Sequence, residues 1–80
     1  MLKVKTMKDK AKNLLKAELA KRGLKYPDLA FLMKKKQYNE NADAIRTKIN
    51  RGTFSFEFFL KVLDAIDAEL IVKDKNEIKF

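Results

Sequence analysis

The side chains best suited to chemistry in this chain lie in residues 41–52, where polar and cationic groups recur between apolar ones. At 3.6 residues per turn, Ala42, Ile45 and Ile49 share one face of a predicted helix. The opposite face carries Asp43, Thr47, Asn50 and Arg51. Arginine and asparagine form paired hydrogen bonds with base edges, and threonine contacts a base or a thymine methyl group. The pattern therefore predicts a helix that packs on one face, binds with the other and ends at Gly52.

Positive charge is concentrated in the first half of the chain, which has 80 residues and a net charge of +8. Residues 1–36 carry twelve basic and three acidic groups, whereas residues 53–80 carry four basic and six acidic groups. A polyanion such as double-stranded DNA is therefore expected to meet the first half. The lysines at 34–36 are expected either to contact phosphate or to complement the negative end of a helix.

Composition argues against an enzyme. The chain contains no histidine and no cysteine, which removes the usual thiolate and imidazole metal ligands and nucleophile pairs. Acidic groups at 64, 67 and 69 are interpreted as solvated. We expect no catalytic residue, no metal and no cofactor. No apolar run is long enough for a secretion signal or a membrane span, so a cytoplasmic protein without a membrane partner is expected.

The elements that must position the binding helix are predicted from capping and turn residues within a single domain, 1–80. Thr6 and Ser55 are predicted N-caps, and either Asn41 or Asn39 is predicted to cap the third helix. Pro27 suits a first helical turn, and Gly23 ends a helix. Helices are predicted at about 7–22, 27–35, 41–51 and 56–67, and strands at about 69–73 and 77–80. Residues 1–5 are predicted to form an arm or a strand. The two C-terminal strands form a hairpin expected to pack on the fourth helix, pair with residues 2–5 or pair across a dimer.

The fourth predicted helix is apolar over a wide arc. Its main face is predicted to contain Phe56, Phe59, Val62, Leu63 and Ile66, with Phe54 stapled onto Phe59 ahead of it. Phe54, Phe56 and Phe59 are expected to be core residues. Because Phe58 and Ala65 lie on the flank of that arc, a homodimer or partner interface is predicted at Phe58, Val62, Ala65, Leu70 and Val72.

Three segments carry a resemblance to a known class: Leu14–Gly23, Tyr26–Ala30 and Ile45–Phe54. Together they resemble lambda-repressor-like (Xre-type) helix-turn-helix domains, and more closely an uncharacterised family of short bacterial proteins of that class. The resemblance covers about residues 12–67. It implies a mainly α, four-helix domain, to which the sequence adds a short C-terminal β-hairpin or strand. Domains of this class usually bind DNA as dimers, in which the second helix crosses the phosphate backbone and the third enters the major groove.

The resemblance also implies a set of DNA-binding residues. The residues carried over by position are joined by the lysines at 34–36 and by the predicted cap Asn41. The full set is Lys25, Tyr26, Lys34, Lys35, Lys36, Asn41, Arg46, Thr47, Lys48, Asn50 and Arg51. One feature departs from the pattern, because the connection 34–40 is longer than the usual turn of about 3–4 residues. Either the second helix runs further or the turn is extended.

These expectations combine in a small DNA-binding transcriptional regulator of bacterial or phage type. The alternative from another class is a protein-interaction module, such as an antitoxin or phage inhibitor, that binds an acidic protein through the same basic surface. A third reading is a protein that coats nucleic acid without sequence preference.

Overall fold

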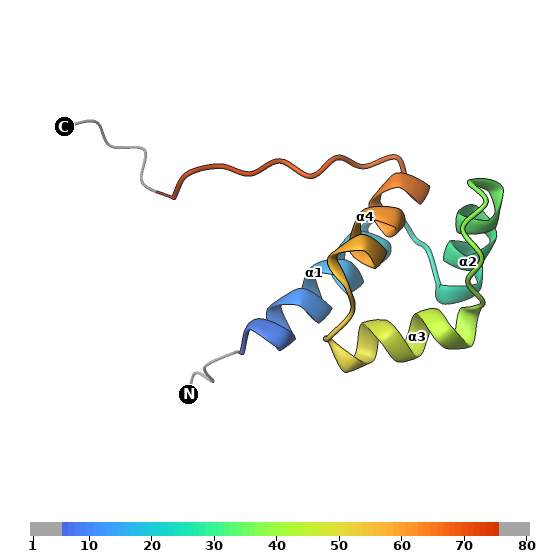
Figure 1. Cartoon of the computed structure of the whole chain (residues 1–80), viewed down its shortest axis with the longest axis horizontal. Helices are drawn as coiled ribbons and strands as arrows, with labels where there is room; N and C mark the ends of the chain where they lie inside the picture. Colours follow the sequence, from blue (N-terminus) through green and yellow to red (C-terminus); the bar gives the residue numbers. More distant parts are fainter. Residues whose placement is uncertain (1–5, 76–80) are drawn as a thin grey trace.

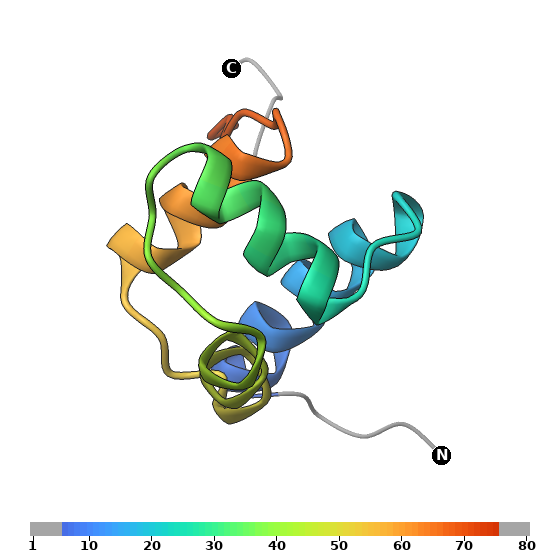
Figure 2. The same cartoon turned by 90° about the vertical axis from the view of Figure 1, so that its right-hand side faces the viewer.

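Four helices make up the body of the described part of the chain. The computed structural model describes residues 6–75, and its helices are α1 (Met7–Lys21), α2 (Tyr26–Lys35), α3 (Ala42–Arg51) and α4 (Phe56–Ala65). In Figures 1 and 2, α3 lies at one edge of the molecule, where it packs against α1 and α2, while α2 also packs against α4. The predicted mainly α class and its four helices are confirmed.

The beginnings of the helices follow from their first residues. Thr6, Asn41 and Ser55 each accept a backbone hydrogen bond from the residue three positions later, at 3.0, 2.7 and 3.0 Å. Such caps satisfy amide groups that have no partner inside the helix. Pro27 lies in the first turn of α2, where its missing N–H costs nothing. These predicted helix starts are confirmed to within one residue.

Three of the helices end in the same motif. Gly23, Gln37 and Asp67 have left-handed backbones, with φ of 69°, 69° and 59°. In each case the next residue donates its N–H to a carbonyl five positions back, as Tyr38 does to Met33 at 2.8 Å. This is the Schellman arrangement, which pairs carbonyls left open at a helix end. It ends α2 at Lys35, so the connection to α3 is an extended turn rather than a longer helix.

The core lies between the helices and takes side chains from all four of them. Its fully buried members are Leu15, Leu29, Met33, Ile45, Ile49 and Val62. The two isoleucines are those that the helical period placed on the inner face of α3. Within residues 6–75, no helix is both long and apolar enough to cross a bilayer.

The face that α4 presents to the core differs in part from the prediction, although Val62, Leu63 and Ile66 of the predicted main face are buried. Phe58, Val62 and Ala65, predicted to meet a partner, are 4%, 0% and 5% exposed in the core of their own chain. They therefore leave no surface for an interface. Phe56, predicted to be a core residue, is 62% exposed. The predicted staple is confirmed, since the rings of Phe54 and Phe59 stack with centroids 6.4 Å apart.

The segment after α4 leaves the helical body as an extended chain (Figure 1). Residues 69–73 are not a strand, so that prediction is wrong, while predictions for residues 1–5 and 77–80 lie outside the described residues. Leu70 and Val72 are 44% and 85% exposed. Between residues 69–75 and the remainder of the described chain, no backbone hydrogen bond forms. A β-prone sequence becomes a strand only beside another strand, and none is described here.

Candidate nucleic-acid interface

The outer face of α3 carries the predicted base-reading groups in the open. Ile45 and Ile49 are fully buried on the inner face, which fixes the rotation of the helix about its axis. The exposed face carries Arg46, Thr47, Asn50 and Arg51. Each has hydrogen-bonding capacity directed away from the core, and in Figure 2 the other helices all lie to one side of α3. The structure thus brings these four predicted residues together.

One acidic group interrupts this face near its beginning. Asp43 lies 2.9 Å from a guanidinium nitrogen of Arg46, one turn along the helix. The carboxylate side chain is 82% exposed and that of the arginine 53%. Exposed pairs of this kind contribute little to stability. The pair partly neutralises a charge that would repel phosphate, and Arg46 can exchange Asp43 for another acceptor at small cost.

Lys48 and Asn41 are engaged within the protein. The Nζ of Lys48 lies 2.8 Å from Glu40, whose side chain is only 14% exposed. The same ammonium group is 4.9 Å from the centre of the Phe58 ring. Asn41 uses its side-chain oxygen to cap α3. Both residues therefore hold α3 in place instead of extending the exposed row.

The first turn of α2 lies on the α3 side of the molecule. In both views the beginning of α2 is nearer to α3 than its end is (Figures 1 and 2). Lys25 is exposed and Tyr26 is half-buried, while the Lys25 N–H donates to Asp28 at 2.9 Å. The exposed ammonium group is available to an anion, whereas the positive end of the α2 dipole already faces the carboxylate of Asp28.

The three lysines at the other end of α2 are not gathered with α3. Lys36 lies 3.8 Å from carboxylate oxygens of both Asp64, in the last turn of α4, and Asp67, just after the helix. The Nζ of Lys35 is 5.6 Å from the centre of the Phe31 ring. Lys34 is exposed in the same turn. This cluster lies at the end of α2 remote from the recognition face predicted for α3.

Lys8 is a basic residue near α3 that the predicted DNA-binding set does not include. The structure places it in the first turn of α1. A Cβ built on Gly52 would lie 2.7 Å from its side-chain Cγ and 2.8 Å from its carbonyl oxygen. Lys8, exposed to solvent, therefore adds positive charge at the end of α3. Sequence spacing cannot reveal a neighbour 44 residues away along the chain.

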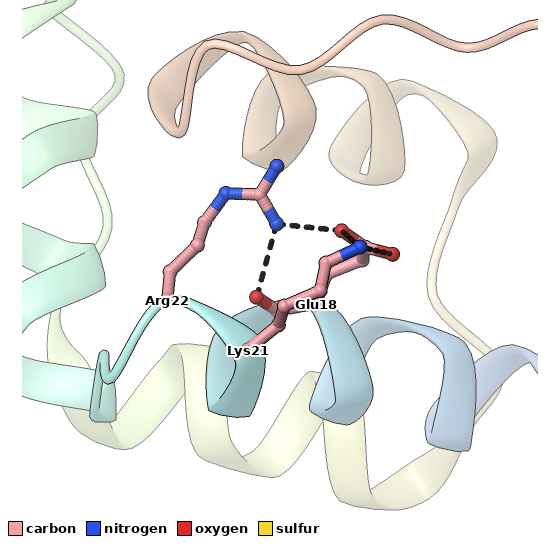
Figure 3. A network of polar contacts seen from close by, with 3 residues as sticks. All are labelled: Glu18, Lys21 and Arg22. Atoms are coloured by element: carbon pink, nitrogen blue, oxygen red, sulfur yellow. Dashed lines mark hydrogen bonds and ion pairs between the residues drawn. The ribbon is translucent and has the colours of Figure 1, made fainter.

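A second basic group, at the end of α1, is neutralised locally. Figure 3 shows Lys21 and Arg22 converging on the carboxylate of Glu18. Arg22 also donates to the Glu18 carbonyl oxygen at 3.1 Å. Its hydrogen bond to the carboxylate, reinforced by Lys21, holds the pKa of Glu18 below its ordinary value. These two cations are thus occupied with an internal partner.

The extended turn between α2 and α3 is tied to α4. Tyr38 packs against the core, and its hydroxyl donates to Asp64 at 2.7 Å. The ammonium group of Lys61 lies 5.6 Å from the centre of the Tyr38 ring. The turn is therefore fixed by the Schellman motif at one end and by Tyr38 in its middle. This anchoring gives α3 a defined orientation despite the length of the turn.

The hydrogen bond from Tyr38 to Asp64 predicts that stability depends on pH. The hydrogen bond to the Asp64 carboxylate raises the pKa of the Tyr38 phenol above its ordinary value. Its contribution to stability is then complete below about pH 10, the pKa of an unfolded tyrosine. It is lost as the pH rises through the higher folded value. In a Tyr26→Phe background, absorbance titration should show Tyr38 ionising late, and Asp64→Ala should return its pKa toward the ordinary value. Identical titration curves with and without Asp64→Ala would contradict the hydrogen bond between Tyr38 and Asp64.

Comparison with known proteins yields one match. The family model described as a domain of unknown function (DUF6471) matches residues 7–71. No curated protein matches the chain, and no solved structure matches it. The matched region includes all four helices and the beginning of the extended segment.

Proposed function

The chain belongs to the family described as a domain of unknown function (DUF6471), and we propose that it binds double-stranded DNA by placing α3 in the major groove. The observation that carries the proposal is the exposed polar row on α3, held from behind by two fully buried isoleucines. An α-helix fits the width of the major groove. A surface helix that presents arginine, asparagine and threonine on a rigid base is suited to reading it.

The chemistry of the row supports sequence recognition. Arg46 and Arg51 suit the O6 and N7 acceptors of guanine, and Asn50 suits the N6 and N7 edge of adenine. Thr47 lies between them and can contact a base or a thymine methyl group. Each well-formed paired contact contributes about 1–3 kcal/mol of discrimination between bases. Sequence-specific binding of this kind is what a transcriptional regulator requires.

Positive groups beside α3 supply the sequence-independent part of the binding. Lys25 at the beginning of α2 and Lys8 at the beginning of α1 are exposed. Contacts of lysine with phosphate release counterions and make the affinity depend strongly on salt. The resemblance to Xre-type domains supports the same roles for α2 and α3. Lys36 and Lys48, which are paired with carboxylates of the same chain, do not contribute to the proposed contact.

The proposal is tested by selecting duplexes from a randomised library and measuring binding to the selected sequence by fluorescence anisotropy. Binding should weaken steeply between about 50 and 200 mM salt. Arg51→Ala should relax the preference at one base pair by about 1–3 kcal/mol. Lys25→Ala should weaken binding to every duplex alike and reduce the salt slope by about 1.

Lys73→Ala is the matched control, since it removes the same charge from the extended segment and should leave binding unchanged. Salt-sensitive binding with no selected sequence would indicate a coating protein instead of a regulator. Absence of binding to any duplex at the lower salt concentration would overturn the proposal. That outcome would favour the alternative in which the basic surface binds an acidic protein.

A further inference from the structure

An apolar trough lies on the surface between α1 and α4. Its larger part has a volume of about 480 Å³ and its lining includes Leu14, Phe59 and Leu63. Its smaller part, about 300 Å³, is lined by Leu14 and Phe59 again and by Phe56. The two depressions adjoin at Leu14 and Phe59, which line both, and together they are called here the α1–α4 trough. Leu14 and Phe56 are 49% and 62% exposed, so apolar surface remains in contact with water.

The same face of the chain carries an extended apolar segment whose side chains become more exposed with distance from α4. Residues 69–75, called here the arm, include Leu70, Ile71 and Val72, which are 44%, 71% and 85% exposed. Its backbone makes no hydrogen bond within the described part of the chain. Extended chain with free amide and carbonyl groups and apolar side chains is the form in which peptides dock in grooves or add to strands.

We propose that the α1–α4 trough receives the arm of a second copy of this chain, so that two copies exchange arms about a two-fold axis. The root of the arm already lines the end of the trough, through Leu70 and Ile71. Donor and receptor therefore lie side by side on one face. A two-fold contact requires this arrangement, because the same patch must supply both halves. Each copy then buries one arm and fills one trough.

Charge favours a second copy as the occupant. Although the chain carries a net charge of +8, the charged residues that line the trough are Glu18, Arg22 and Glu69. Arg22 is already paired with Glu18. The trough is therefore free of the positive excess found elsewhere, and two copies can approach there with the least repulsion. An acidic partner would instead be drawn to the basic surfaces.

The placement of the arm also leaves α3 free. In Figure 1 the arm leaves the molecule on the side opposite to α3. Exchange of arms therefore does not require any residue of the proposed DNA-binding face. The trough and the arm are sufficient for this exchange, whether or not the chain binds DNA.

The first test measures the mass of the protein in solution by light scattering over about a hundredfold range of concentration, as mass action requires. The expected result is a shift toward twice the 9.3 kDa of one chain. Leu70→Ser combined with Val72→Ser should raise the dissociation constant at least about tenfold, because each substitution is present twice in a two-fold dimer. Phe31→Gln is the matched control, since Phe31 is 63% exposed on α2 and should not affect association.

The second test locates the contact through disulfides, which the absence of native cysteine makes unambiguous. A Val72→Cys chain is mixed with a Leu14→Cys chain of different mass and oxidised. The mixed disulfide should form, whereas Val72→Cys mixed with Phe31→Cys should give none above background. A monomeric mass at every concentration would overturn the proposal. So would association that survives both arm substitutions, or a disulfide confined within one chain when both cysteines are placed in it.

Discussion

Replacing Phe58 by alanine is expected to lower the free energy of unfolding by about 3–5 kcal/mol. The ring is 4% exposed and lies 5.7 Å, centre to centre, from that of Phe54. It also contacts the ammonium group of Lys48, which is paired with Glu40. Removal of the ring leaves a cavity and takes away the cation–π contact. Since domains of this size are stabilised by only about 5–10 kcal/mol, roughly half of the stability is at risk.

Urea unfolding of dilute protein, followed by circular dichroism, measures this loss. Phe56→Ala is the matched control, because Phe56 is the same residue type, two positions earlier on α4, but is 62% exposed. Its replacement should cost less than about 1 kcal/mol. If Phe58 faced a partner, as its sequence position indicated, the unfolding of dilute protein would be nearly unchanged. Equal effects of the two substitutions would contradict the placement of α4 in the structure.

The difference between Phe58 and Phe56 shows why the sequence could predict the existence of α4 but not its orientation. Apolar side chains occur nearly all round this helix, so a 3.6-residue period does not select one face. The packing of α2 against α4 makes the selection, and that contact joins residues far apart in the chain. By contrast, α3 has a narrow apolar stripe, and its two buried isoleucines were identified correctly.

Helix ends were predictable where the residue type carries the signal. Gly23 and Gly52 mark left-handed positions that glycine adopts at little cost. Gln37 and Asp67 adopt the same conformation without glycine. The motif at Gln37 is supported by Tyr38, which packs on the core and contacts α4. Such tertiary support leaves no mark in local sequence, and for this reason the length of the turn before α3 remained open.

The candidate site divides in the same way. The exposed row on α3 follows from helical spacing, which is a local property. The removal of Lys48 and Lys36 from the exposed cationic set depends on Glu40 and on the carboxylates at the end of α4. The addition of Lys8 depends on the approach of α1 to α3. The charge count alone therefore predicts a negatively charged partner. Tertiary contacts decide which lysine and arginine side chains are available to bind it.

The approach of α1 to α3 leads to the other large expected effect, which is at Gly52. Gly52→Ala should cost about 2–4 kcal/mol, because φ is +74° and the added Cβ would lie 2.8 Å from the backbone oxygen of Lys8. Gly23→Ala is a control matched in backbone, since φ is +69° and no atom lies within 4 Å of the new Cβ. It should cost only about 1–2 kcal/mol, the penalty of the left-handed conformation itself.

Thermal unfolding of both variants measures the difference, at about 4–8 °C per kcal/mol for a domain of this size. Because the backbone penalty is common to both, the excess at Gly52 reports the close contact of α1 with the end of α3. Equal losses at the two glycines would mean that α1 can withdraw at little cost, and that Lys8 is not held beside the end of α3.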